Sequence, residues 1–172
     1  MRLLASLGRT RIVVAILTLI TALQITLISV GNLTDFGTNQ AFVVHVLAMD
    51  TTFRSPHMMW RAIINPEIAT GAYVAIIIWE SLTALVLIAA CIAWLWALGR
   101  HQGTDLARRL STCGWLMELM LFGGGFIVVG GEWFQMWQSS KWNGLQPALQ
   151  NFLIVSVGLI LAHLPEREPA EA

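Results

Sequence analysis

The clearest scarcity in this chain of 172 residues is of charged side chains, which make up only 12% of it. A soluble domain carries about 25% charged residues, so this chain has half of what a water-exposed surface needs. Hydrophobic residues reach 56%, and the mean hydropathy is +0.69. We infer that its solvent is mostly lipid. The formal net charge of zero argues against nucleic acid as a partner.

Motifs that indicate an enzyme or a cofactor are also missing. Cys91 and Cys113 form neither a C-x-x-C pair nor a zinc spacing, which argues against thiol-redox chemistry. A transmembrane haem needs axial ligands on the spans, usually histidines, and only His163 lies near one. The chain has no Gly-rich phosphate loop and no Ser-His-Asp arrangement, and its halves lack the similarity of an inverted-repeat transporter. We expect no enzymatic activity, no catalytic residue, no metal site and no cofactor.

Long apolar runs are what the chain does have. About 20 apolar residues cross a bilayer as a helix, and a helix satisfies its own backbone polar groups in lipid. We predict an all-α fold, a four-span transmembrane helix bundle in a single membrane domain over residues 1–172. The predicted spans cover about residues 12–30, 71–98, 110–129 and 149–164. The first is too long for a signal-peptide core and no A-x-A site follows it, so we interpret it as an uncleaved span.

The distribution of Lys and Arg predicts the orientation, because cytoplasmic loops carry the excess. Seven lie in the two terminal segments and in the loop between the second and third spans: Arg2, Arg9, Arg11, Arg100, Arg108, Arg109 and Arg167. Three lie in the other two loops, namely Arg54, Arg61 and Lys141. We therefore expect both termini in the cytoplasm and the loops 31–70 and 130–148 on the periplasmic side of a bacterial inner membrane.

These two loops are rich in aromatic residues, and we predict that they form an ordered cap outside the bundle. Asn39 is suited to cap a helix through its side chain, and apolar residues then recur at helical spacing, which predicts a short interfacial helix. Those apolar residues are Phe42, Val43, Val46 and Leu47. In the other loop the indoles of Trp133 and Trp137 prefer the headgroup region. We expect loop 31–70 to fold back and pack against Trp133, Phe134 and Trp137.

The polar residues of the cap allow two interpretations. Histidine and aspartate together can bind a divalent metal, but none of them shows a recognised ligand spacing. We prefer the alternative that they hold the loops together, with Arg54 or Arg61 paired to Asp35, Asp50, Glu67 or Glu132. The cap residues singled out are Asn32, Asp35, Asn39, His45, Asp50, Arg54, Arg61, Glu132, Trp133 and Trp137.

Two carboxylates, Glu80 and Glu118, fall inside predicted spans. An ionised carboxylate in hydrocarbon costs at least a few kcal/mol, so such residues usually face the protein interior. On a helix, Glu80 shares one face with Tyr73, Ile77, Thr83, Ala84 and Leu87, and the opposite face is purely apolar, with Val74, Ile78, Leu82 and Leu85. Glu80 is either a proton-accepting or ligand-binding group, or a structural partner for another helix or a loop arginine. Counting residues from the span ends places Glu80 and Glu118 about 15 Å apart in depth, too far to share a proton directly.

Four runs together resemble a bacterial family of predicted small integral membrane proteins called domain of unknown function 2165. The runs are GNLTDFGTNQAFVVHVLAMDTTF at 31–53, WRAI at 60–63, the IIWE run that ends at Glu80, and GGEWFQMWQSSKWNG at 130–144. They match in order and spacing along nearly the whole chain. The resemblance implies a small four-span inner-membrane protein with no established activity to transfer, and it directs attention to the outward loops.

Three functional hypotheses remain, all with the lipid bilayer as a partner. The preferred one is a non-enzymatic accessory, assembly or regulatory component that binds a larger inner-membrane protein complex. The second is a small transporter, channel or proton-conducting protein that uses Glu80 and Glu118 as intramembrane carboxylates. The third is a periplasmic-face binder of a lipid, a quinone or a metal.

Overall fold

The computed structural model describes residues 9–100 and 103–165, and within these ranges the chain is helical with no strand. The helices are α2 (Thr10–Thr34), α3 (Phe36–Ala48), α4 (Pro66–Gly99), α5 (Asp105–Leu119), the π-helix η2 (Met120–Trp133) and α6 (Leu145–Ala162), with short 3₁₀ turns at η1 (Met59–Arg61) and η3 (Met136–Gln138). In the described residues, four helical stretches are long and apolar enough to cross a membrane: α2, α4, α5 continued by η2, and α6. The predicted all-α, four-span architecture is confirmed.

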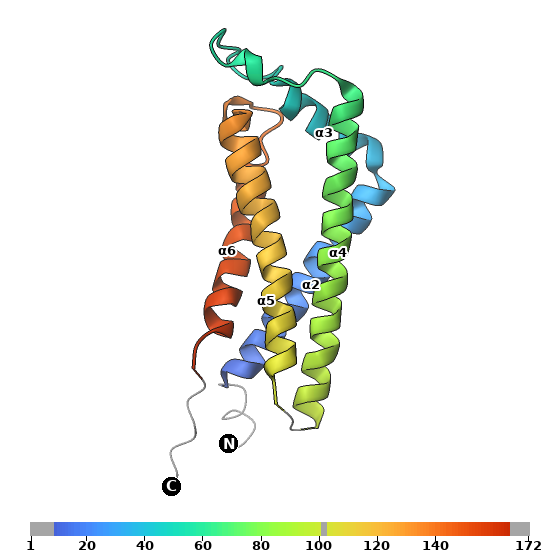
Figure 1. Cartoon of the computed structure of the whole chain (residues 1–172), viewed down its shortest axis with the longest axis vertical. Helices are drawn as coiled ribbons and strands as arrows, with labels where there is room; N and C mark the ends of the chain where they lie inside the picture. Colours follow the sequence, from blue (N-terminus) through green and yellow to red (C-terminus); the bar gives the residue numbers. More distant parts are fainter. Residues whose placement is uncertain (1–8, 101–102, 166–172) are drawn as a thin grey trace.

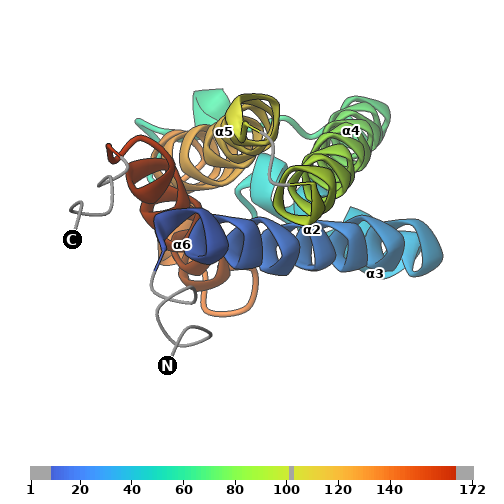
Figure 2. The ribbon, with the colours of Figure 1, turned by 90° about the horizontal axis from the view of Figure 1, so that it is seen from below.

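The helices form an elongated bundle with its loops divided between two ends. In Figure 1, α2 begins and α6 ends at the same end as the connection between α4 and α5, whereas α3 and both long loops lie at the opposite end. Seen along the bundle in Figure 2, α2 extends across one side of the view while α4 and α5 are seen nearly end-on, so α2 is tilted relative to them. The two loops that the charge count placed together therefore share one end. Arg2 and Arg167, which entered that count, lie outside the described residues.

Each spanning helix begins ahead of its predicted span, and the start of α4 shows why. Asn65 accepts a hydrogen bond from the backbone N–H of Glu67 at 2.8 Å, and Pro66 occupies the first helical position. Both are helix-start signals, and they lie before the hydrocarbon-length run that hydropathy detects. The helix thus begins five residues ahead of the predicted residue 71.

The predicted cap at Asn39 is wrong. α3 begins at Phe36, with Asp35 before it, and Asn39 lies inside the helix, where its Nδ2 donates to the Asp35 carbonyl at 3.4 Å. The physical reason is that α2 runs on to Thr34 and α3 starts almost at once, so the chain bends at Asp35 without a separate start signal. The short helix carrying the apolar residues 42–47 is present as expected.

Small residues set the distance between the spanning helices. A Cβ added to Gly114 in α5 would lie 2.4 Å from Leu87 Cδ2 in α4, and one added to Gly158 in α6 would lie 2.9 Å from the Trp115 ring. Leu87 and Trp115 are both fully buried, and small residues are what let helices approach closely in membranes. Trp115 also donates from Nε1 to Thr21 Oγ1 in α2 at 2.8 Å. The bundle core is therefore tightly packed where α5 contacts α2, α4 and α6.

The second half of the third span is wider than an ordinary α-helix. η2 is a π-helix, and its last turn is closed by an i→i+5 hydrogen bond from Phe134 N to Val129 O at 3.0 Å. π-helical segments are rare and usually short. η2 contains the run Gly123-Gly124-Gly125, where a Cβ on Gly123 would lie 3.1 Å from the Phe152 ring of α6. The glycine run therefore lies in an unbroken helix, and at Gly123 the missing side chain lets η2 pack closely against α6.

Candidate functional site: an apolar pocket beneath the cap

The two long loops contact each other closely and form the cap, defined as residues 35–65 and 130–144. Thr51 Oγ1 and Ser139 Oγ are hydrogen-bonded at 2.8 Å, and the backbone N–H of Phe53 donates to Gln138 Oε1 at 2.8 Å. The Phe53 ring meets Trp137 edge-on at 5.9 Å between centroids. Trp60 meets Trp133 in the same way at 5.5 Å, and Phe134 is buried. The predicted packing of loop 31–70 against the second loop is confirmed.

His45 is held on both sides within the cap. Its ring stacks on Trp142 with centroids 4.6 Å apart and planes at 12°, and its Nδ1 lies 2.6 Å from Asp50 Oδ2. This is the only ion pair in the described part of the cap, and no three metal-type side chains converge anywhere in residues 9–100 and 103–165. His45 therefore ties α3 to the loop that follows η2.

The predicted pairing of Arg54 or Arg61 with a cap carboxylate is wrong. The Arg61 guanidinium lies 4.6 Å from the centroid of Trp133 and 5.4 Å from that of Trp60, and its Nη1 donates to the Trp133 carbonyl at 3.3 Å. Two indole faces attract the cation, while Asp50 is engaged by His45. Arg54 is exposed, as are the four carboxylates proposed for it, namely Asp35, Asp50, Glu67 and Glu132. Among the described residues, the two loops are therefore joined by ring contacts, by hydrogen bonds and by the Arg61 guanidinium, with no salt bridge between them.

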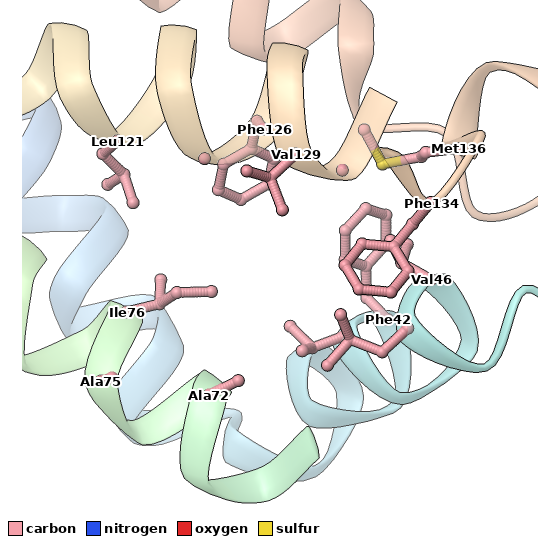
Figure 3. Close-up of a pocket in the computed structure, with 14 residues that line it drawn as sticks. Phe42, Val46, Ala72, Ala75, Ile76, Leu121, Phe126, Val129, Phe134 and Met136 are labelled. Atoms are coloured by element: carbon pink, nitrogen blue, oxygen red, sulfur yellow. The ribbon is translucent and has the colours of Figure 1, made fainter. Parts of the chain in front are cut away.

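Directly beneath the cap lies a pocket of about 320 Å³ between α4 and η2, closed at its cap end by α3. Figure 3 shows Phe42 and Val46 of α3 and Ala72 and Ile76 of α4 on one side of it, and Phe126 of η2 on the other. Every lining residue is apolar: Phe42, Val43, Val46, Leu47, Ala72, Ala75, Ile76, Leu121, Gly125, Phe126, Val129, Gly130, Phe134 and Met136.

The pocket opens on the lateral surface of the bundle. Three of its lining residues, Ala75 on α4 and Gly125 and Val129 on η2, are themselves exposed. Lower down, α4 and α5 touch at Leu87 and Gly114, so the two spans diverge toward the cap. α3 packs against α4 at the cap end of this gap. The Phe36 ring lies 4.8 Å from the Tyr73 ring, and Gln40 Nε2 donates to Thr70 Oγ1 at 2.7 Å.

Sequence reasoning found the α3 side of this pocket but missed the rest. It placed the apolar face of residues 42–47 against the membrane interface, whereas Phe42, Val43, Val46 and Leu47 line the pocket. The small residues that leave the space open, Ala72, Ala75, Gly125 and Gly130, gave one usable signal. Ala72 and Ala75 lie three residues apart, which is a helical spacing, whereas Gly125 and Gly130 lie five apart and share a face only in the π-helix that the structure shows.

Glu80 is buried in the bundle, only 2% exposed, and has a partner on another helix. Asn32 Nδ2 of α2 donates to Glu80 Oε2 at 2.7 Å, and Tyr73 Oη donates to the Asn32 carbonyl at 3.0 Å. The predicted division of α4 is confirmed: the face around Glu80 is buried, and Val74, Ile78, Leu82 and Leu85 are exposed. The partner is thus an α2 amide and not a loop arginine.

Glu118 is 1% exposed, and its Oε1 has no hydrogen-bond partner in the described chain. The predicted depth separation of about 15 Å from Glu80 is wrong. Because Gly114 faces Leu87, Glu118 is level with Thr83, about 4.5 Å along the axis from Glu80. About 7.5 Å of the error came from starting α5 at residue 110, whereas it begins at Asp105. The rest came from assuming that the two helix ends lie at the same level. No hydrogen bond joins the two carboxylates, and neither lines the pocket.

Comparison with known proteins adds one finding. A family model described as predicted small integral membrane protein, domain of unknown function 2165, matches residues 10–165. No curated protein and no solved structure matches the chain.

Proposed function

The chain belongs to the family of predicted small integral membrane proteins, domain of unknown function 2165, and from that premise we propose that it binds the acyl chain of a membrane lipid. The proposed site is the pocket between α3, α4 and η2. In this proposal the protein is a non-enzymatic component of the membrane. The observation that carries the proposal is the wholly apolar lining of a pocket of about 320 Å³ that opens on the lateral surface.

Physical chemistry narrows the occupant of this pocket. A buried water needs two to four polar partners, and the lining side chains offer none. Ligand pockets for small molecules measure about 300–1,000 Å³ and use a few polar groups to orient the ligand. This pocket has the size without those polar groups, which suits a hydrocarbon chain. Lipid tails surround the bundle and reach the opening directly.

Filling the pocket should remove the lipid. We expect Ala72→Phe to lower the amount of phospholipid that stays bound through purification in mild detergent by about tenfold, the equivalent of about 1.4 kcal/mol. The new ring would occupy the space beside Ile76 and Val46. Native mass spectrometry of the purified protein measures the bound lipid.

The matched control is Ala89→Phe, which makes the same change on the same helix at an exposed position outside the pocket. It should retain as much lipid as the wild type. Equal retention by Ala72→Phe and Ala89→Phe would contradict the proposal, as would a wild-type protein that retains no lipid.

A second candidate function, binding to a larger inner-membrane complex as an accessory component, rests on the exposed aromatic residues of the cap. Phe53 is 74% exposed and Trp60 68%, although each also contacts a tryptophan of the second loop. Large exposed apolar groups often mark interaction sites. A protein that co-purifies in fixed ratio would favour this function over lipid binding alone.

The conduction hypothesis has less support, because the pocket does not include Glu80 or Glu118.

We infer that the cap faces the periplasm of a bacterial inner membrane, with both termini in the cytoplasm. The excess of Lys and Arg at the opposite end supports this orientation. A phosphatase reporter fused after Ala172 should be inactive, and the same reporter inserted near Ser55 in the cap should be active, because this enzyme folds only in the periplasm. An active fusion after Ala172 would overturn the orientation.

A further inference from the structure

Arg61 lies at the cap end of the lipid pocket. Its Nη1 donates to the carbonyl of Trp133 at 3.3 Å, and the next residue, Phe134, lines the pocket. Two residues beyond Arg61, the backbone N–H of Ile63 donates at 2.8 Å to the carbonyl of Leu47, which also lines the pocket. Arg61 is therefore linked to the rim of the pocket in two ways, through its own hydrogen bond to Trp133 and through that of Ile63 to Leu47.

The positive charge of Arg61 has no anionic partner in the described chain. Its Nε is buried and makes no hydrogen bond, and the only ion pair in the described cap joins His45 to Asp50. The guanidinium instead lies against Trp60 and Trp133, whose rings stand at 86° to each other. A partly buried charge that lacks a counter-charge is costly, so an anion that reaches this position would be bound favourably.

We propose that Arg61, framed by Trp60 and Trp133, binds the phosphate of a phospholipid whose acyl chain fills the pocket; this inference rests on the proposed lipid-binding function. A guanidinium presents its N–H groups as a planar fork that matches phosphate oxygens. One N–H is directed to the Trp133 carbonyl and Nε is buried, so the remaining Nη N–H groups are the ones that a phosphate would reach. Tryptophan rings prefer the headgroup level of a bilayer, the depth at which a phosphate lies.

In this proposal, the absence of a salt bridge to Arg61 has a functional consequence. A salt bridge would occupy the N–H groups that a phosphate needs, whereas indole faces stabilise the cation and leave its edge available. Arg54 in the same loop is a useful contrast: it is exposed and lies over no ring. Of the two arginines, only Arg61 combines the aromatic frame with the attachment to the pocket rim.

The test compares two lipids that differ only in the phosphate headgroup. Dioleoyl phosphatidylglycerol and dioleoylglycerol are titrated into the delipidated full-length protein in mild detergent, and binding is measured by native mass spectrometry. The wild type should bind the phospholipid about tenfold more tightly, which corresponds to about 1.4 kcal/mol. Arg61→Gln should bind both lipids with the affinity that the wild type has for dioleoylglycerol, and Arg61→Lys should recover part of the preference. Arg54→Gln should behave as the wild type.

The outcomes separate this inference from the function on which it rests. If the wild type binds neither lipid, the pocket proposal fails and the headgroup proposal fails with it. If it binds both equally, or if Arg61→Gln keeps the preference, only the headgroup proposal is overturned, and Arg61 then serves to hold the cap. Unchanged binding of dioleoylglycerol by Arg61→Gln shows that the variant is folded. If inorganic phosphate in large excess protects the wild type against heat as well as the phospholipid does, the site binds free phosphate and the lipid assignment is wrong.

Discussion

Glu80→Leu is expected to lower the melting temperature of the purified protein by roughly 3–6 °C, for a loss of about 1–2 kcal/mol. Leucine has nearly the volume of glutamate but cannot accept the hydrogen bond that Asn32 donates at 2.7 Å. Hydrogen bonds between membrane helices contribute about 0.6 kcal/mol on average and up to about 1.7, and a donor left without a partner adds about 1–3 kcal/mol. Removing the buried carboxylate also removes its desolvation cost, which offsets part of this loss, so we expect a loss near the low end of the summed range.

Two controls isolate the hydrogen bond. Glu80→Gln keeps an oxygen that accepts from Asn32 and should melt within about 1 °C of the wild type. Asn32→Ala removes the donor, so the double variant with Glu80→Leu should be less destabilised than the sum of the single variants. Thermal unfolding in detergent, followed by circular dichroism, measures the four variants and the wild type.

Glu118 provides a matched comparison on the neighbouring helix. It is as buried as Glu80, but its Oε1 has no partner in the described residues. Burying an unpartnered polar group is unfavourable, so Glu118→Leu should be neutral or stabilising. If Glu80→Leu proves harmless while Glu118→Leu destabilises, the assignment of Glu80 as the structural carboxylate is wrong.

Local patterns in the sequence predicted much of the bundle because they obey simple periodicities. Apolar runs located the four spans, and the 3.6-residue repeat separated the buried face around Glu80 from the exposed face around Leu82. Aromatic clustering predicted that the loops would meet through Trp133 and Trp137. Each of these features depends on one segment and its surroundings, so the sequence of that segment suffices.

Features that depend on the relative placement of two helices were not predictable in the same way. The depth of Glu118 relative to Glu80 follows from the register of Gly114 against Leu87, which hydropathy does not contain. The pocket exists because α4 and η2 diverge around α3, and η2 itself departs from α-helical geometry. Arg61 lies against the rings of Trp60 and Trp133, which come from two different loops. None of these outcomes has a signal confined to one segment.

The order of the cap is tested by a disulfide between its two loops. We expect Thr51→Cys/Ser139→Cys to cross-link almost completely under mild oxidation in intact membranes, because the two γ-oxygens lie 2.8 Å apart and a disulfide needs about 2.05 Å between sulfurs. The native Cys91 and Cys113 lie on α4 and α5, away from the cap, and are replaced by alanine. A protease site inserted at Gly103 makes the result visible, since only the new disulfide then joins the two halves on a gel.

The mispaired variant Thr51→Cys/Ser140→Cys is the control, because Ser140 is exposed whereas Ser139 is buried. It should cross-link slowly if the cap holds one arrangement. Equal rates for the two pairs, together with free proteolysis of residues 51–58, would show that the loops move independently. α3 would then not close the cap end of the pocket, and Arg61 would have no fixed place between Trp60 and Trp133. A fast, pair-specific disulfide therefore tests the structural premise of both the lipid pocket and the phosphate site at its rim.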